Sequence, residues 1–420
     1  MEQNRRYRVS KKKQRDNPLN ILVDIFNYVL TSILLGVALT WILLIRSMWI
    51  TFRDSPFLDK FDSKPNPKPK VSVILPARNE EGFIERCLNS LIDQDYEDYE
   101  IIVIDDRSED RTGEIIRKIA EKSVRVKYVL AGPKPQKWMG KNWACIEGFK
   151  KATGDLLLFT DADTFHKKNI ISLAVDHLLS GNLDALTVIP KMLCLDRWIK
   201  ITLPVLSTFL HTRFSALRVN DSSKKTGYFF GSFFIITRKT YEMVGTHEGV
   251  KTEIVEDGAL GKKVKEAGFK LKMVRGEHLV EAVWARDWAT LWHGLKRLMT
   301  PLYLQSSIAA VAIFVAVLFL LFMPFPIFVY SAIFENLSES FSILFGTSII
   351  AAILVFLGSI FDAKKGLGLG TKYGLMAPIG GAIIVGGFAS GILNAKSNNA
   401  VTWRGRTYSM VDTIQNSISL

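Results

Sequence analysis

The sequence contains little cysteine and no grouping of histidines that is typical of a metal site. Its three cysteines, Cys87, Cys145 and Cys194, lie far apart in a chain of 420 residues. This scatter excludes a disulfide framework and the paired spacings of structural zinc sites. The six histidines show no ligand spacing either, and we interpret them as structural. Internal repeats and low-complexity tracts are also absent, so the chain does not belong to the solenoid or disordered classes.

The charge of the chain is strongly unbalanced, with a formal net charge of +13. Its basic residues concentrate at the N-terminus (5–15) and in a proline- and lysine-rich segment (60–70), on either side of an apolar stretch. Basic clusters beside a membrane span attract anionic lipid headgroups and influence topology. The arrangement therefore predicts anionic lipid headgroups as partners and argues against nucleic acid.

Apolar segments divide the chain into regions. Hydrophobic residues make up 48% of the sequence, and four stretches are about long enough to cross a ~30 Å hydrocarbon core. They are 21–50, 306–330, 341–361 and 376–393. The first is too long in its apolar core to be a cleavable signal peptide. The expected regions are a basic tail (1–20), a transmembrane segment (21–50), an extended linker (51–69), a globular domain (70–300), a membrane region (301–395) and a C-terminal tail (396–420).

Short apolar runs alternate with helical patterns in the globular domain. Runs at 71–75, 101–104 and 156–160 are separated by patterns at 82–92, 112–121 and 142–152. This alternation is typical of βαβ units and predicts an α/β domain. Each run is followed by polar or acidic residues, and the carboxyl ends of parallel strands meet at one edge of a sheet, where α/β proteins bind ligands.

Asp161 and Asp163 follow the third run, one residue apart. Carboxylates in this position can hold Mg²⁺, which takes one or two protein carboxylates and completes its shell with substrate phosphates. An isolated Asp-x-Asp is common in surface loops, but here it shares an edge with two other polar strand ends. The pattern therefore predicts a metal site for Mg²⁺ or Mn²⁺.

The ordered motifs resemble those of family 2 inverting glycosyltransferases. They are Pro76-Ala77-Arg78-Asn79-Glu80, Asp105-Asp106, Asp161-Ala162-Asp163 and Glu256-Asp257. Within that family the chain is most similar to the membrane-anchored enzymes that glycosylate lipids, such as carotenoid, hopanoid-associated and ceramide glucosyltransferases. Gly140-Lys141-Asn142-Trp143-Ala144 and Trp403-Arg404-Gly405-Arg406-x-Tyr408 fit that subgroup. The resemblance implies a GT-A fold with a Rossmann-like mixed sheet, a UDP- or GDP-type sugar donor and a membrane-lipid acceptor.

The resemblance also implies roles for individual residues. Asp257 matches the general base, with Glu256 orienting it, although two acidic residues also suit the first turn of a helix. The residues expected at the nucleotide sugar are Pro76, Arg78, Glu80, Asp105, Asp106, Lys141, Asp161 and Gly231. Alternatives remain at three places: Asp105 or Asp106 could cap the next helix with Ser108, Lys141 could be a surface lysine, and the aromatic residues around Gly231 could be strand core.

Residues 293–298 fall where processive relatives carry Gln-x-x-Arg-Trp. Arg297 occupies the arginine position and could contact the diphosphate, but Gly294 and Leu298 replace the glutamine and the tryptophan. The departure weakens the alternative of a processive polysaccharide synthase. A scaffold protein with an inactive transferase domain is the other alternative, and the complete set of carboxylates argues against it.

The last expectations concern the membrane. Apolar and basic residues recur at near-helical spacing in 196–219, which predicts an interfacial helix, unless the apolar face is simply core. Trp284, Arg286, Trp288 and Trp292 suggest a second such element. We expect a multi-pass protein of the cell membrane with a cytosolic catalytic domain. The tail is expected to return to the cytosolic face, with 376–393 bending back at its proline and glycines.

Overall fold

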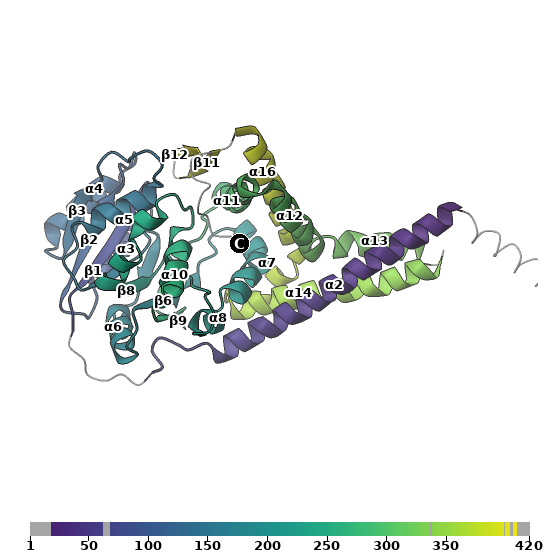
Figure 1. Ribbon diagram of the computed structural model, residues 1–420, viewed down its shortest axis with the longest axis horizontal. Helices are drawn as coiled ribbons and strands as arrows, with labels where there is room; N and C mark the ends of the chain where they lie inside the picture. The colour runs from purple at the N-terminus through teal and green to yellow at the C-terminus, as the bar shows by residue number, and fades with distance from the viewer. Residues whose placement is uncertain (1–17, 62–67, 336–337, 399, 404–405, 410–420) are drawn as a thin grey trace, which may run out of the picture. The chain divides into compact units, whose positions relative to one another are not determined.

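The computed structural model of the chain (Figure 1) describes residues 18–61, 68–335, 338–398, 400–403 and 406–409. These residues form two compact units. Within the described part, the first unit contains the chain up to Trp49, Ile201–Thr208 and Val311–Gly386. The second contains Ile50–Lys200, Phe209–Ala310 and the chain from Gly387 onward.

A seven-stranded mixed sheet is the centre of the second unit. Its strands lie in the order β3-β2-β1-β4-β8-β6-β9. Strand β8 runs antiparallel to both of its neighbours, and the other pairs are parallel. The predicted α/β class and the predicted mixed sheet are confirmed. The bounds are β1 Val71–Ala77, β2 Tyr99–Asp105, β3 Val126–Leu130, β4 Leu156–Phe159, β6 Ala185–Ile189, β8 Phe234–Thr237 and β9 Leu271–Arg275.

Both faces of the sheet are buried, which explains why its strands read as continuous apolar runs. Alternate residues of a strand point to opposite faces, so Val73 enters one core and Ile74 the other. The first core contains residues of α3 Ile84–Ile92, α4 Thr112–Lys122 and α6 Ile170–Ser180. The second contains residues of α5 Gly140–Phe149, α8 Ala216–Asn220, α9 Arg238–Met243 and α10 Glu256–Glu266. Figure 1 shows α3 and α5 beside these strands.

The strand register brings the predicted motifs to one edge. Ala77 of β1 pairs with Asp105 of β2, and Ile74 pairs with Phe159 of β4. The residues that follow these strands therefore leave the sheet on the same side. Smaller elements complete the unit: β5 Thr164–His166, β7 Lys191–Met192, β10 Val280–Ala282, the 3₁₀ helix η1 His247–Val250, α11 Trp288–Gln305, and the antiparallel hairpin of β11 Ala400–Trp403 and β12 Arg406–Ser409.

The expected linker (51–69) differs from the prediction in its first part. Helix α2 extends from Pro18 to Asp54 and so includes the start of the linker. Leu58 then lies fully buried in the first core, and its N–H donates to the carbonyl oxygen of Arg275 at 2.9 Å. An apolar side chain with a buried site available gains by leaving water, so this part is packed rather than extended. Residues 62–67 lie outside the described residues.

Three helices among the described residues are long and apolar enough to cross a membrane: α2 Pro18–Asp54, α14 Glu339–Lys365 and α16 Ala377–Asn398. The expected single span at 306–330 is instead a pair, α12 Ser307–Leu321 and α13 Pro324–Phe334, bent by 56°. Proline has no N–H and its ring clashes with the preceding turn, so Pro324 starts a new helix. Counting the bent pair as one span gives four candidates.

The expected bend within 376–393 is also corrected, because α16 is continuous. Its proline, Pro378, lies in the first turn, where a missing N–H breaks no helical bond. Its glycines allow close packing instead of breaking the helix: a Cβ on Gly380 would lie 2.6 Å from the carbonyl oxygen of Ile201. The first unit also contains α15 Thr371–Gly374 and a contact between α2 and α12, in which the Trp41 indole donates to the Leu320 carbonyl at 2.9 Å.

The predicted helix at 196–219 is divided into α7 Arg197–Arg213 and α8 Ala216–Asn220. The division occurs because Ser215 caps the start of α8 by accepting the N–H of Arg218. Ile199 and Val205 on α7 are fully buried. An interfacial role for this segment stays a prediction.

Candidate active site

Four titratable side chains from three segments meet at the edge of the sheet: Lys141, Asp161, Glu256 and Asp257. Lys141 lies in the first turn of α5, and its Nζ is 2.6 Å from Asp161 Oδ1 and 2.5 Å from Glu256 Oε1. Glu256 and Asp257 are the first two residues of α10, so both readings of this pair hold: they begin a helix and they face the site. Burial alone would lower the pKa of Lys141, but Asp161, Glu256 and Asp257 raise it well above its usual value. Lys141 is therefore not a surface lysine.

Asp257 is held by two backbone N–H groups. Its Oδ2 accepts from Gly231 at 2.7 Å and its Oδ1 from Gly258 at 2.8 Å. Burial, followed by the charge of Glu256, raises the pKa of Asp257 to about 7, although Lys141 opposes the shift. A carboxylate with a pKa near neutrality is suited to accept a proton at working pH.

Gly231 approaches this cluster so closely that a side chain does not fit. A Cβ at this position would lie 2.8 Å from Asp257 Oδ2, 3.0 Å from Asp161 Oδ2 and 3.1 Å from Lys141 Nζ. Absence of a side chain lets the backbone N–H reach the carboxylate. Of the surrounding aromatic residues, Phe229 and Phe233 are fully buried, so those two belong to the core.

Asp161 and Asp163 are each paired with a different cation. Asp161 faces Lys141, and Asp163 Oδ2 lies 3.4 Å from Nη2 of Arg286, which also pairs with Glu80. Among the described residues, no three His, Cys, Asp or Glu side chains are grouped to hold a metal ion. Two carboxylates are nevertheless the hard oxygen donors that Mg²⁺ or Mn²⁺ prefers, and phosphate oxygens can supply the other ligands. The donor set thus fits a divalent cation that arrives with a diphosphate.

Arg78 and Asp105 shape the loop after β2. The guanidinium of Arg78 donates to the carbonyl oxygens of Asp106 at 2.8 Å and Arg107 at 2.6 Å. Asp105 accepts the N–H of Ser108 at 2.8 Å and the hydroxyl of Tyr128 at 3.2 Å. The alternative role for Asp105, a cap of the next helix, is wrong: Asp105 bonds to Ser108 within the loop, and α4 begins at Thr112 after Arg111, which makes no side-chain capping bond.

The loops after β1 and β2 are locked to one another. Asn79 and Arg107 both have positive φ, 54° and 55°, which is uncommon outside glycine. Asn79 Oδ1 accepts the N–H of Glu109 at 2.9 Å, and its own N–H donates to Ser108 Oγ at 3.2 Å. Strained backbone of this kind persists where the surroundings hold it, and it is concentrated at ligand sites.

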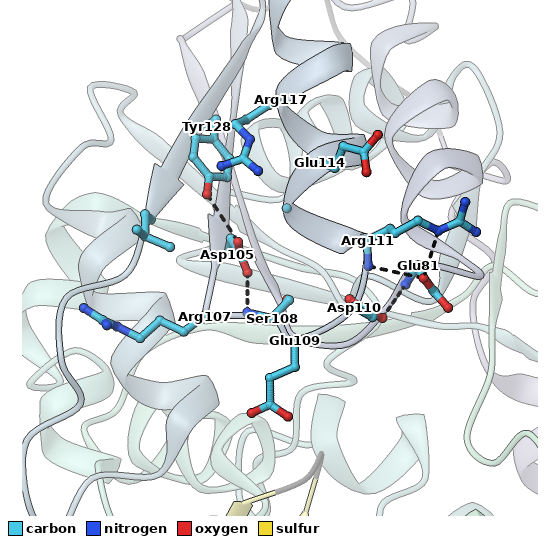
Figure 2. Close-up of a pocket in the computed structure, with 12 residues that line it drawn as sticks. Glu81, Asp105, Arg107, Ser108, Glu109, Asp110, Arg111, Glu114, Arg117 and Tyr128 are labelled. Atoms are coloured by element: carbon cyan, nitrogen blue, oxygen red, sulfur yellow. Dashed lines mark hydrogen bonds and ion pairs between the residues drawn. The ribbon is translucent and has the colours of Figure 1, made fainter.

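A cavity of about 740 Å³ lies on the outer side of this loop, between β2, α4 and β3 (Figure 2). Figure 2 shows Asp105 between Tyr128 and Ser108, and Glu81 bonded to Arg111 and Asp110. Of the predicted site residues, Asp105 alone lines this cavity. The cavity is therefore distinct from the cluster around Lys141 and Asp257.

Two arginines in the site were not predicted from the sequence. Arg286 was assigned to an interfacial element, but α11 begins at Trp288 with a capping box between Asp287 and Thr290, which leaves Arg286 before the helix. Arg406, from β12, pairs with Asp106 Oδ2 and donates from Nη2 to the carbonyl oxygen of Asp106 at 3.1 Å. Its motif was visible in the sequence, but its partner, 300 residues away, was not.

The other predicted residues lie nearby or on neighbouring elements. Pro76 is the second-last residue of β1, where it lies in register with Ile104 of β2. Arg297 is half-buried on α11. His247 occupies a structural position: burial lowers its pKa to about 3, and its Nδ1 lies 2.7 Å from the Tyr241 hydroxyl.

Known proteins match part of this chain. Residues 72–245 match the family model Glycosyl transferase family 2. A probable glycosyltransferase of Bacillus subtilis strain 168, YdaM, is 33% identical over 162 residues, which are 36% of this chain and 37% of that protein. The 4,4'-diaponeurosporenoate glycosyltransferase of Staphylococcus haemolyticus is 29% identical over 237 residues, 53% of this chain and 60% of that protein.

Among solved structures, the mannosyltransferase PcManGT of Pyrobaculum calidifontis, in complex with GDP-Man and Mn²⁺, aligns with a TM-score of 0.49 and 18% identity. The alignment covers 77% of this chain and 98% of that one. The chain spans 37% and 60% of the two curated relatives named above. The family match is confined to residues 72–245, which include strands β1 (from Ser72), β2, β3, β4, β6 and β8 of the sheet.

Proposed function

We propose that this protein transfers a sugar from a UDP- or GDP-type nucleotide sugar to a lipid acceptor, with inversion at the anomeric carbon. The observation that carries the proposal is the contact between Asp257 Oδ2 and the N–H of Gly231, beside Lys141 and Asp161. It gives a carboxylate with a pKa of about 7 next to a buried cation. One group accepts a proton and the other neutralises a phosphate, which are the two needs of direct displacement.

Asp257 is the base in this proposal. Its ionised carboxylate takes the proton of the acceptor hydroxyl as the oxygen attacks the anomeric carbon. The Gly231 N–H fixes the orientation of Oδ2, and Glu256 remains bound to Lys141. Since proton transfer requires the carboxylate form, the pKa of about 7 sets the pH at which the base becomes active.

Lys141 and Arg286 face the leaving diphosphate. Both already lie against carboxylates of the Asp161–Asp163 segment, so a phosphate entering here meets two fixed cations. A divalent cation held by Asp161 and Asp163 would add Lewis-acid stabilisation of the leaving group. Arg78, Asp105 and Asp106 form the nucleoside end, and Arg297 is a further candidate for the diphosphate.

The lipid acceptor is supported by the curated relatives and by the apolar helices. The Staphylococcus relatives are named for diaponeurosporenoate, a carotenoid acid, and α2, α14 and α16 can cross a membrane by length and composition. We propose a multi-pass membrane protein with its catalytic domain in the cytosol, where nucleotide sugars are available. In this arrangement, α7 lies near anionic headgroups.

Purified full-length protein, radiolabelled UDP- and GDP-sugars and a total lipid extract test the function. We expect label in a lipid product with the wild type and with Asp93→Asn, a matched change of an exposed aspartate. Asp257→Asn should give none. Label only in a water-soluble polymer would favour the processive synthase, and no transfer from any donor would favour the inactive scaffold.

A further inference from the structure

Asp106 is held from two directions by arginines that are remote in sequence. Its side chain is only 5% exposed. Arg78, after β1, donates to its carbonyl oxygen at 2.8 Å. Arg406, from the C-terminal hairpin, donates to the same carbonyl oxygen at 3.1 Å and pairs with Oδ2 through its other terminal nitrogen. The planar guanidinium thus spans the main chain and the side chain of one residue, which fixes the carboxylate more firmly than a single contact does.

The second carboxylate oxygen of Asp106 is unsatisfied. Oδ1 is buried and accepts no hydrogen bond from the described residues. A buried polar atom without a partner costs free energy, and such atoms are rare unless a ligand or ordered water completes them. The carboxylate therefore has one anchored oxygen and one that can accept a hydrogen bond from a bound molecule.

We propose that Arg406 is a positioning residue for the donor: it anchors Oδ2 and the carbonyl oxygen of Asp106, so that Oδ1 alone accepts an N–H or O–H of the nucleoside. The inference rests on the proposed function, because it assumes a nucleotide donor. It makes the C-terminal hairpin part of the donor site, although the hairpin lies outside the residues matched by the family model. Arg406 acts through Asp106 and not on the reacting atoms.

The charged groups around Asp106 are consistent with this role. Burial raises the pKa of Asp106, and Arg406 followed by Arg78 opposes the shift, while Asp105 adds to it. Lys134 lies close enough for its own pKa to respond to both Arg406 and Asp106. Without Arg406, Asp106 would protonate at a higher pH, and a protonated Oδ1 would no longer accept.

Equilibrium binding of UDP and GDP to the full-length protein in detergent tests the proposal without requiring transfer. Arg406→Ala should weaken binding by about tenfold or more, because a charge-assisted contact that orients the acceptor is lost. Arg406→Lys keeps the positive charge but not the two parallel N–H donors of the guanidinium, so its nucleotide affinity should lie between those of the wild type and Arg406→Ala. Arg125→Ala, a matched change at a half-buried arginine bonded to the Glu97 carbonyl, should bind as the wild type does.

Two further measurements separate positioning from a purely structural role. In an Asp106→Asn background, Arg406→Ala should change affinity by less than about twofold, because the group it positions is gone. The affinity of Arg406→Ala should also fall at a higher pH than that of the wild type on acidification, whereas Arg406→Lys should keep the wild-type midpoint. If the hairpin only stabilises the fold, Arg406→Ala should have the same effect on affinity with Asp106 as with Asn at that position, and the pH midpoint of binding should not shift.

Three results would overturn the proposal. Unchanged binding by Arg406→Ala would do so while leaving the proposed function intact. Tighter binding would show that the hairpin blocks the site. Equal weakening in the Asp106 and Asp106→Asn backgrounds would assign Arg406 a role independent of Asp106. If the wild type bound neither nucleotide, the proposed function would fall as well. If Arg406→Ala does not fold, Arg406→Gln, which removes the charge but keeps a hydrogen-bond donor, takes its place in the affinity and pH-midpoint measurements with the same expected and contrary outcomes.

Discussion

Gly231→Ala adds one methyl group that reaches three of the four titratable groups of the active-site cluster. The added methyl would lie 2.8 Å from Asp257 Oδ2, 3.0 Å from Asp161 Oδ2 and 3.1 Å from Lys141 Nζ. Distances below 3.0 Å between a Cβ and another heavy atom are not tolerated, so Asp257 must move or rotate. The movement lengthens the 2.7 Å bond from the Gly231 N–H, which holds the proposed base in place.

The size of the effect follows from these contacts. Loss of a hydrogen bond to a charged group costs about 1.5–3 kcal/mol, and overpacking costs about 1–3 kcal/mol. If about 2–3 kcal/mol of this appears in the transition state, kcat/KM falls by about 30- to 150-fold at 25 °C. The N–H also favours the ionised carboxylate. Loss of this hydrogen bond should therefore raise the pKa of Asp257 above about 7, so that the rise of kcat/KM with pH moves to higher pH.

The assay is the pH dependence of kcat/KM for sugar transfer, with thermal unfolding measured on the same samples. Gly82→Ala is the matched control, because a Cβ at Gly82 meets no atom within 4 Å. We expect Gly82→Ala to match the wild type in rate and pH midpoint. A Gly231→Ala protein with wild-type rate and midpoint would refute the assignment of Asp257 as a base held by Gly231.

Two other predictions follow from single carboxylates. Asp257→Asn should abolish turnover and leave the affinity for UDP or GDP within about twofold of wild type, since it removes a base and no diphosphate contact. In the wild type, kcat should rise as the pH passes through about 7, because only the ionised carboxylate of Asp257 accepts a proton. Burial would raise the pKa of Glu100, but hydrogen bonds from Lys127, Ser72 and Thr153 lower this pKa to about 2. The ionised Glu100 therefore stabilises the fold above about pH 4.5, and this stabilisation is lost as the pH falls toward 2. Glu100→Gln should therefore destabilise the protein by about 2–3 kcal/mol at pH 7 and flatten this acid limb, measured by thermal unfolding against the exposed control Glu114→Gln.

Local patterns in the sequence predicted the sheet edge well, and the reason is geometric. Parallel strands deliver their carboxyl-terminal residues to one edge, so the runs ending near Ala77, Asp105 and Phe159 were enough to place three motifs together. The sequence alone could not decide whether the aromatic residues around Gly231 belong to the core or to the site. The burial of Phe229 and the close approach of Gly231 to the carboxylates both depend on the packing of α10 against this segment.

Contacts between remote segments could not be predicted. The pair of Arg406 and Asp106 joins residues 300 apart, and no spacing rule links a C-terminal hairpin to the exit of β2. The contacts of Arg286 could not be predicted from its neighbours, which are tryptophans, because its position depends on a capping box that starts α11 two residues later, at Trp288. The break before Pro324 was visible as proline in an apolar run, but hydropathy alone treats that run as continuous.

The balance of charge at the sheet edge leads to a last prediction. Five carboxylates, those of Glu80, Asp161, Asp163, Glu256 and Asp257, share two cations, Lys141 and Arg286. A diphosphate entering alone would add negative charge to a site already in excess, and repulsion between like charges at short range is strong where water is partly excluded. We therefore expect a divalent cation, held by Asp161 and Asp163, to be required for diphosphate binding and not only for turnover.

Binding of UDP and of uridine to the full-length protein, with and without chelator, separates the two effects. Chelation should weaken UDP binding by about tenfold or more and leave uridine binding unchanged, because uridine carries no phosphate to be repelled. Asp163→Asn removes one negative charge as well as one ligand, so UDP binding by this variant should be weaker than that of the wild type with metal and less sensitive to chelator. Wild-type UDP affinity that does not change on chelation would mean that Lys141 and Arg286 neutralise the diphosphate by themselves.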